Sequence, residues 1–341
     1  MPDTWLHRIE TATTRTPLVA SQYATSGTLL ERVVLADGRT VIAKWMSPEI
    51  DIWMRALSDD GRILRLWSSG LLATLPPSVD HATLGVEPFD RGWLHVMRDV
   101  SEAMLPMTGP SPRGDWRRVL SGARAMHETF RGQPIDRLCP LAAHLDSFTH
   151  MDAHPSLAPS DVGRTYARGW ELFADVVPDD VAMRVYALRD DPATLLAALH
   201  ECEPTLVHGD FRRANVGLTA DALVVVDWGT FTANASPWLD IANFLARATI
   251  EGTKDEQVED VRSIYGSWFD EREFGLALIF AFLECAPGRT YAVERATSDA
   301  LRVRAQADLA WWIARCASNW TAGLAKPAYG SRRPHRRSGP R

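Results

Sequence analysis

The stretch that decides the fold is residues 205–229, TLVHGDFRRANVGLTADALVVVDWG. It holds the tripeptide His-Gly-Asp, which ends at Asp210, and four further residues separate this aspartate from Asn215. Twelve residues after the asparagine comes Asp227, the first residue of Asp-Trp-Gly. Two carboxylates and an amide oxygen are hard ligands of the kind that suits Mg²⁺ and the phosphates it carries. These three side chains are therefore the first candidates for a functional site.

The same stretch predicts a β-hairpin around these side chains. Residues 223–226 are apolar and mostly β-branched, and the turn-forming residues 219–221 precede them. A strand, a tight loop and a second strand would bring Asp210, Asn215 and Asp227 to one rim. A polar hairpin with a satisfied turn and no function is the alternative. The two spacings together with the apolar strand favour the functional interpretation.

The order of these motifs matches the catalytic loop of kinases. That loop has His-x-Asp, four residues and an Asn, followed by an Asp-x-Gly whose aspartate holds Mg²⁺. Here Gly209 lies between the histidine and the aspartate, and Trp228 occupies the middle of the second motif. In this form the chain resembles the aminoglycoside phosphotransferase family, a small-molecule branch of the kinase-like fold.

The resemblance implies a role for each polar residue of the stretch. Asp210 would orient or deprotonate a substrate hydroxyl, and Arg212 would meet a phosphate oxygen. Asn215 and Asp227 would hold Mg²⁺ together with the phosphates of ATP. Asp240, shortly after the second motif, is similar to a family aspartate at a helix start, and we expect it to cap that helix or brace the catalytic loop.

A bias among the basic residues singles out Lys44. Arginine outnumbers lysine 34 to 3, and Lys44 is the only lysine in the first 253 residues. It lies in an expected strand, residues 40–45, that follows the Asp-Gly turn of residues 36–39. A compact ammonium at the end of a strand is what a nucleotide phosphate site needs, although chance survival is the alternative. The resemblance places Lys44 on the α- and β-phosphates of ATP.

The kinase-like fold also needs an acidic partner for Lys44. Residues 48–67 are expected to be helical with a break near their middle, and the resemblance indicates Asp60 as the partner. Asp59 and Glu49 are its rivals. For each of the three, a solvated charge on a helix surface is the alternative.

Two further parts of the nucleotide site follow from the resemblance and the order of the elements. Residues 21–27, which include Ser26, would lie over the phosphates. This loop has one glycine and no Gly-x-Gly-x-x-Gly, so a plain hairpin connection is an equal alternative. Met97 and Val100 fall where the family has its inter-lobe hinge, against which the adenine would lie.

The chain as a whole predicts an α+β, protein-kinase-like two-lobed fold, with a small antiparallel-sheet N-lobe and a larger, mainly helical C-lobe. Residues 1–100 would form the N-lobe, residues 101–327 the C-lobe with the catalytic loop and substrate site, and residues 328–341 a disordered basic tail. The expected strands are residues 18–20, 28–35, 40–45, 83–86 and 92–97. The expected helices are residues 115–130, 166–177, 192–200, 258–269, 274–285 and 299–322, with a polar insertion at 147–160.

Composition excludes several other classes of protein. The 341 residues are 46% hydrophobic and 23% charged, which is ordinary for a globular chain. The net charge of −6 gives no general attraction to nucleic acid. The four cysteines lack Cys-x-x-Cys spacing and are expected to be reduced and buried. The N-terminus has no signal-peptide pattern, and the apolar run 276–283 is too short to span a membrane, so we expect a cytoplasmic protein without a membrane partner.

The predicted function is ATP- and Mg²⁺-dependent transfer of the γ-phosphoryl group to a free hydroxyl of a small molecule. Acidic residues between 251 and 273 would suit an amine-bearing substrate such as an aminoglycoside, and solvated helix faces explain the same charges. These acidic residues are Glu251, Asp255, Glu256, Glu259, Asp260, Asp270, Glu271 and Glu273.

Other functions are weighed against this one. A catalytically weak kinase-like module that binds nucleotide is the main alternative, supported by the doubtful partner of Lys44 and the unusual phosphate loop. Metal-dependent hydrolysis by His208, Asp210 and Asp227 would need further closely spaced ligands, which the sequence does not provide. A protein kinase is disfavoured, because the thirteen residues from Asp227 to Asp240 are too few for a full activation segment.

Overall fold

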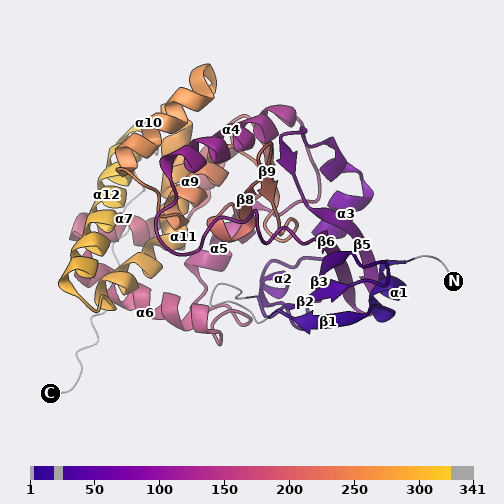
Figure 1. The fold of residues 1–341 in the computed structure, drawn as a ribbon. Coiled ribbons are helices and arrows are strands. Elements are labelled where there is room, and N and C mark those ends of the chain that lie inside the picture. The colour runs from indigo at the N-terminus through magenta and orange to yellow at the C-terminus, as the bar shows by residue number, and fades with distance from the viewer. Residues whose placement is uncertain (1–3, 19–25, 324–341) are drawn as a thin grey trace.

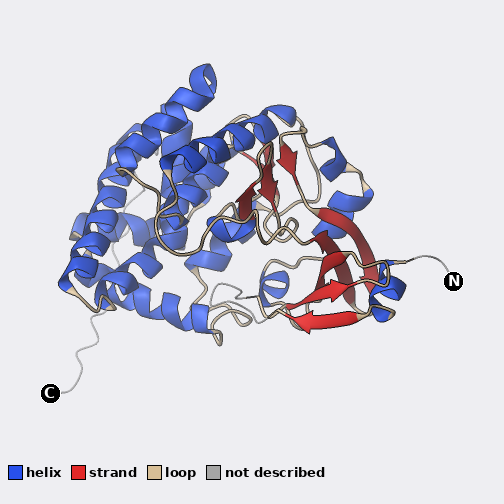
Figure 2. Ribbon diagram, in the orientation of Figure 1, coloured by secondary structure: helices blue, strands red, loops and turns tan. Residues whose placement is uncertain are grey.

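The computed structural model of the protein describes residues 4–18 and 26–323. A five-stranded antiparallel sheet occupies the N-terminal part, and helices make up most of the remainder (Figure 1; Figure 2). The sheet has the order β1-β2-β3-β6-β5. Its strands are β1 (Thr14–Pro17), β2 (Leu29–Val34), β3 (Thr40–Met46), β5 (Thr83–Phe89) and β6 (Gly92–Arg98).

The central strand β3 explains how the sheet carries both a core and a site. Successive side chains of a strand point to opposite faces. Val41 and Ala43 face helix α1 (Trp5–Glu10) and pack in a fully buried apolar cluster with its Ile9. Ile42 and Lys44 point the other way, towards the helical part, where they line a pocket. The same strand therefore anchors the sheet and presents a buried ammonium to the site.

The predicted strands are largely found, with one displacement. The hairpin pairs β2 with β3, and β6 pairs with both β3 and β5. The first strand forms at Thr14–Pro17, and Leu18 of the predicted strand 18–20 is not part of it; residues 19 and 20 lie outside the described residues. Its threonines at positions 14 and 16 are β-branched, which favours extended backbone.

The expected helical stretch 48–67 is two short helices with a break. These are α2 (Ile52–Ala56) and α3 (Arg62–Ser68). Gly61 separates them with a left-handed backbone, φ +105°, and a Cβ there would lie 2.7 Å from the Trp93 ring. Glycine is therefore needed for the turn and for the close approach of β6.

The helical part is built around α11 (Glu271–Glu294), which packs against α12, α9, α6, α5 and α8. By length and composition this helix could span a bilayer, yet 83% of its most apolar window is buried inside the protein, as in the core helix of a globular fold. The other helices here are α4 (Arg113–Thr129), α5 (Leu141–Thr149), α6 (Asp161–Val176), α7 (Asp179–Asp190), α8 (Ala193–His200), α9 (Trp238–Arg247), α10 (Lys254–Tyr265) and α12 (Asp299–Gly323), with short 3₁₀ turns at Leu71–Thr74, Arg213–Asn215 and Gly266–Trp268.

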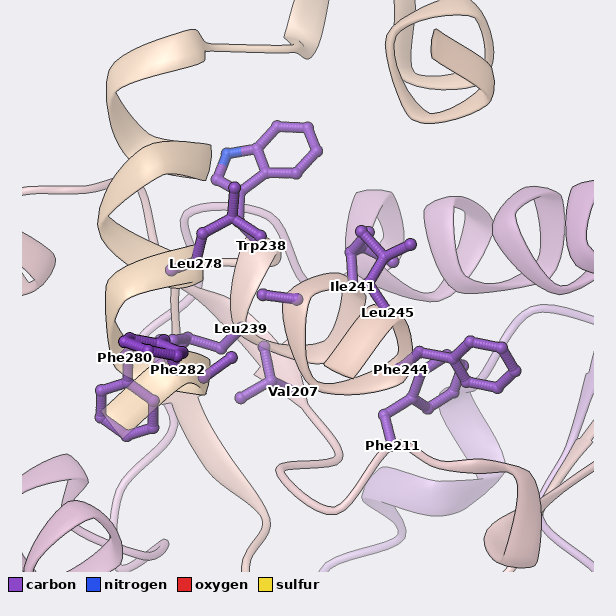
Figure 3. Close-up of a cluster of buried hydrophobic side chains, with 14 of the residues drawn as sticks. Val207, Phe211, Trp238, Leu239, Ile241, Phe244, Leu245, Leu278, Phe280 and Phe282 are labelled. Atoms are coloured by element: carbon purple, nitrogen blue, oxygen red, sulfur yellow. The ribbon is translucent and has the colours of Figure 1, made fainter. Parts of the chain in front are cut away.

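Figure 3 shows part of the core between α9 and α11. Trp238, Ile241 and Phe244 of α9 are each at most 1% exposed, and they meet Leu278 and Phe282 of α11 in one apolar cluster. Apolar burial of this extent, roughly 1.5–3 kcal/mol for each large side chain, holds α9 firmly in place. The residues that α9 places beside the catalytic loop are thus rigidly supported.

Two small sheets position the motif-bearing stretch. The predicted hairpin is confirmed: β8 (Val216–Leu218) pairs with β9 (Leu223–Val225). The two-residue strand β4 (Val79–Asp80) joins β9 in parallel, and β7 (Thr205–Val207) pairs with β10 (Ala233–Ala235).

Some sequence predictions fail or stay open in the C-terminal half. Helices α5 and α7 were not expected, and the predicted polar insertion 147–160 begins inside α5. Met151 and Leu157 in that stretch are fully buried, so it contributes to the core. The lobe boundary near residue 100 stays a prediction, and the tail 328–341 lies outside the described residues.

Candidate active site

A cavity of about 390 Å³ lies between the sheet and the helical part. It brings together eight of the nine side chains that the sequence predicted for the site, and Asp60 is the one it leaves out. The eight are Ser26, Lys44, Met97, Val100, Asp210, Arg212, Asn215 and Asp227.

Lys44 and Asp227 form an ion pair across the cavity, although 183 residues separate them in sequence. Only 7% of Lys44 is exposed. Burial alone would lower the pKa of Lys44, but the carboxylates of Asp227 and Asp51 outweigh it and raise that pKa. Burial would raise the pKa of Asp227, and Lys44 instead lowers it. Both groups are therefore charged at neutral pH.

The backbone around Asp227 is turned sharply to aim its carboxylate at the cavity. Asp227 has φ +65°, a left-handed conformation that is uncommon for residues other than glycine. Trp228 is fully buried, and its indole Nε1 donates to the Val225 carbonyl at 2.8 Å. Gly229 has φ +125°, and a Cβ there would lie 2.9 Å from that of Ile63 in α3. The tryptophan and the glycine thus lock the turn that holds the aspartate.

Asp210 is held by its own loop. Its Oδ2 accepts hydrogen bonds from Arg212 Nε at 2.9 Å and from Asn215 Nδ2 at 2.8 Å. Asn215 Nδ2 also donates to the Asp210 carbonyl at 2.9 Å. Because these bonds use one carboxylate oxygen of Asp210 and the nitrogen of Asn215, they leave the other carboxylate oxygen and the amide oxygen for ligands in the cavity.

Asp240 braces this loop from below, as expected. It is fully buried at the start of α9, and its two oxygens accept from the backbone N–H groups of His208 and Gly209, each at 2.8 Å. His127 Nε2 lies 3.2 Å from the same carboxylate. Gly209 has φ +80°, and a Cβ there would collide with the Phe231 carbonyl oxygen. The His208-Gly209 backbone that precedes Asp210 is therefore fixed on both sides.

The predicted partner of Lys44 needs correction. The side chain of Asp60 is 80% exposed and pairs with Arg65 on the surface, away from the cavity. The two alternative partners, Asp59 and Glu49, do not reach Lys44 either. Asp59 is buried and accepts from the Gly61 N–H at 2.9 Å, and Glu49 pairs with Arg91 outside the cavity. Asp59 and Asp60 lie in the break between α2 and α3, whereas Glu49 precedes α2, and none of the three lines the cavity.

Asp51 occupies the position that the sequence analysis gave to Asp60. It lines the cavity, is 2% exposed, and caps α2 by accepting from the N–H groups of Trp53 at 2.9 Å and Met54 at 3.0 Å. Thr28 Oγ1 donates to its other oxygen at 2.9 Å. Burial raises the pKa of Asp51, with Lys44 opposing the shift. An aspartate directly before an apolar helical run is an N-cap signal that could have indicated it.

The end of the cavity beside β3 and β6, where the sequence predicts the nucleotide, has a loop and an apolar floor. The Ser26 carbonyl accepts from the Ile52 N–H at 2.9 Å, which ties the described end of the predicted phosphate loop to α2. Residues 21–25 of that loop lie outside the described residues. Apolar side chains, including Met97 and Val100, line the cavity beside β3 and β6; the others are Leu18, Leu30, Ile42, Met104 and Val226.

The opposite end of the cavity was missed by the sequence analysis. It is lined by Trp53, Phe148, Tyr166 and Phe231, with Arg247 beside them. The Phe231 ring lies 5.3 Å from Trp53 and 5.8 Å from Phe148, centroid to centroid. These five residues come from α2, α5, α6, α9 and the loop after Gly229, so no local pattern links them.

The acidic residues at 251–273 do not form a rim around this cavity. Asp260 pairs with Arg113 and Arg117, and Glu256 closes a capping box with Thr253 at the start of α10. Arg262 pairs with two further carboxylates of the set, Glu259 and Glu271. Solvated and paired helix faces, the alternative considered above, account for these charges.

Comparisons with known proteins agree with this geometry. Residues 116–278 match the profile of the phosphotransferase enzyme family, which confirms the resemblance and the assignment of a small-molecule kinase. No curated protein sequence matches the chain.

Solved structures share the fold at low sequence identity. A spectinomycin phosphotransferase has a TM-score of 0.52 at 11% identity, with 94% of this chain and 99% of that one covered. A choline kinase from Streptococcus pneumoniae has a TM-score of 0.51 at 14% identity, with 89% and 94% covered. A microcompartment-associated aminopropanol kinase has a TM-score of 0.51 at 13% identity, with 94% and 97% covered. The predicted kinase-like α+β fold is thereby confirmed.

Proposed function

We propose, from the membership of residues 116–278 in the phosphotransferase enzyme family, that the protein transfers the γ-phosphoryl group of ATP to a hydroxyl of a small molecule. The observation that carries the proposal is the convergence of Lys44, Asp210, Asn215 and Asp227 on one cavity. Neighbours with TM-scores above 0.5 include kinases of small alcohols, and one of them holds ADP with spectinomycin. Buried reduced cysteines and the use of ATP are consistent with a cytoplasmic location.

Asp210 is the proposed base. Its Oδ2 is held by Arg212 and Asn215, so its Oδ1 is the oxygen that would accept the proton of the attacking hydroxyl. The side chain of Asp210 is 15% exposed, so it is accessible from the cavity while little water surrounds it. A base that is orientated before the substrate arrives contributes through position as much as through proton affinity.

Lys44 and Arg212 are the proposed phosphate contacts. The ammonium of Lys44 is kept charged by Asp227 and Asp51, and it lies on the strand beside the apolar nucleotide end. Phosphate oxygens entering the cavity would add anions that this pair of cations can neutralise.

The residues present fit a magnesium ion. Asp227 offers a partly exposed carboxylate and Asn215 an amide oxygen, and Mg²⁺ prefers one or two protein oxygens together with phosphate oxygens and water. Within the described residues no set of three or more His, Cys, Asp or Glu side chains forms a metal cage, which agrees with a metal shared with the nucleotide. When bound, the metal would neutralise charge on the phosphates.

The test is ADP release from Mg²⁺-ATP with a panel of acceptors: aminoglycosides, other antibiotics, amino alcohols, sugars and aromatic alcohols. We expect turnover with at least one acceptor, and its loss in Asp210→Asn but not in Asp60→Asn. Nucleotide binding that is equal in magnesium and in EDTA, with no turnover of any acceptor, would contradict the proposal and support the catalytically weak nucleotide-binding module.

A further inference from the structure

The charges that line the cavity limit what the acceptor can be. Its described carboxylates are Asp51, Asp210 and Asp227, which lie at the end that holds Lys44, called the phosphate end below. Asp51 caps α2, Asp210 accepts from Arg212, and Asp227 pairs with Lys44. The undescribed residues 19–25 contain no acidic side chain. An aminoglycoside carries several ammonium groups, and each buried one needs an anionic partner. The cavity has no carboxylate to spare for them.

The opposite end of the cavity, which we take as the acceptor end, is instead lined mainly by the aromatic rings of Trp53, Phe148, Tyr166 and Phe231. Trp53, Phe148 and Tyr166 belong to one buried cluster, against which Phe231 packs. Burial raises the pKa of the Tyr166 phenol to about 12, so the ring stays neutral. Aromatic faces of this kind stack on a flat apolar body and gain roughly 0.5–1.5 kcal/mol for each ring pair beyond the area buried.

Arg247 gives this end its polarity. Its Nε donates to Asn243 Oδ1 at 3.1 Å, and its Nη2 donates to the buried carboxylate of Glu284 at 3.2 Å. The guanidinium carbon lies 5.0 Å from the centroid of the Phe148 ring. Since a guanidinium has five N–H groups, further donors remain for the cavity, which Arg247 lines with a side chain 20% exposed.

An aromatic cage for a quaternary ammonium is the rival interpretation of the same rings. Arg247 decides against it, because its own cation already lies over Phe148. A second cation bound among these rings would be repelled by Arg247 at short range. Glu284 is 1% exposed and already paired with Arg247, so its carboxylate is not available to a second cation.

We propose that the acceptor is a flat apolar or aromatic alcohol with a carboxylate or similar anionic acceptor that binds Arg247, and not a polycationic aminoglycoside. This inference rests on the proposed function and names the substrate class of the same site. The ring body would pack against the cavity side of the cluster formed by Trp53, Phe148 and Phe231, with its hydroxyl towards Asp210. Recognition of the acceptor would then come from stacking and one charge-assisted contact.

The test measures binding, so it does not depend on turnover. Three probes share one skeleton: 4-(2-hydroxyethyl)benzoate, the corresponding carboxamide, and the corresponding trimethylanilinium. Isothermal titration into the protein with Mg²⁺-ADP should give a Kd for the carboxylate at least about tenfold below that of the cation. The inference is overturned if the trimethylanilinium or kanamycin binds as tightly as the carboxylate.

The variants test whether Arg247 causes the preference. The double variant Arg247→Gln with Glu284→Gln removes both charges together, so that no buried ion is left alone, and it should reduce the carboxylate preference to within about threefold. Arg247→Lys keeps the charge that balances Glu284 and should keep the preference for the anion while weakening its binding. The control is Arg168→Gln with Glu294→Gln, an exposed pair between α6 and α11, which should change nothing.

The two proposals fail separately. If the double variant binds the carboxylate and the cation with the wild-type ratio, Arg247 is not the determinant and the inference is wrong. If kanamycin is phosphorylated and the aromatic probes do not bind, the inference fails while the phosphotransferase function stands. If the carboxylate binds preferentially, but nucleotide binds equally in magnesium and in EDTA and no acceptor in the panel releases ADP, the proposed function fails, and the anion preference then describes a ligand site and not an acceptor site.

Discussion

The two ends of the cavity differ in how they are built. The phosphate end takes its side chains from a few short segments, and the loop that carries Asp210 and Asn215 makes its own hydrogen bonds. The acceptor end takes single residues from five separate elements, none of which has a motif of its own. Phosphoryl transfer imposes the same residue types at fixed positions, whereas an acceptor can be bound by many different surfaces. The motifs can thus indicate the reaction without indicating the acceptor.

The largest expected effect is at Asp227, the proposed metal ligand of the phosphate end. Asp227→Asn keeps the size of the side chain, and Asn tolerates the left-handed backbone, φ +65°, that this position adopts. The variant loses the carboxylate and leaves Lys44 without its ion-pair partner. We expect turnover to fall at least about a thousandfold, which corresponds to ~4 kcal/mol, with loss of magnesium-dependent ATP binding.

Magnesium titrations of ATP affinity in wild type and variant check this expectation. If ATP binding by Asp227→Asn still depends on magnesium, Asp227 is not a metal ligand.

The next effect concerns the base. Asp210→Asn preserves the hydrogen bond from Arg212, and should keep ATP affinity while turnover falls by roughly 10²–10⁴-fold, the usual contribution of a positioned general base. Steady-state ADP release and ATP titration measure the two quantities separately. Unchanged turnover would remove Asp210 from the mechanism.

Lys44→Arg tests geometry without changing charge. The planar guanidinium is larger than the ammonium that fits between Asp227 and Asp51, so we expect kcat/KM for ATP to fall at least about tenfold, ~1.4 kcal/mol. Arg39→Lys, on the exposed turn before β3, is the matched control and should have no effect. Wild-type kinetics in Lys44→Arg would mean that the one lysine in the first 253 residues is not selected by the site.

Phe231→Leu carries the comparison to the acceptor end. Loss of this aromatic ring should raise the KM for the acceptor about three- to tenfold and leave the KM for ATP within about twofold. The reason is that Phe231 packs edge-to-face on Trp53 and tilted on His144, and not against the apolar side chains beside β3 and β6. Kinetics with each substrate varied in turn give the split. Equal changes in both KM values would contradict the division of the cavity into two ends.

The smallest expected difference compares two aspartates. Asp51→Asn keeps the helix cap but removes a charge beside Lys44, so the KM for ATP should rise about threefold. Asp60→Asn removes an exposed ion pair with Arg65 and should stay within measurement error. The reverse outcome would restore Asp60 as the partner of Lys44.

The sequence by itself determined which polar side chains meet at the phosphate end, namely Lys44, Asp210, Asn215 and Asp227, and most of the order of the elements. Asp210, Asn215 and Asp227 lie within one hairpin and the loop before it, so their spacing is a local feature of the sequence. The strand that bears Lys44 directly follows an Asp-Gly turn. Local backbone geometry and short-range hydrogen bonds therefore carry this information, and pattern analysis can recover it.

Only the tertiary structure decided the partner of Lys44 and the nature of the acceptor end. Asp51 and Asp60 both lie in the same expected helical stretch, but Asp51 caps α2 and is buried at the cavity, whereas Asp60 lies in the break before α3 and faces solvent. Arg247 meets Phe148 and Glu284 because α9 and α5 both pack on α11. Contacts between distant elements depend on how helices pack, and a single sequence has no local pattern for that packing.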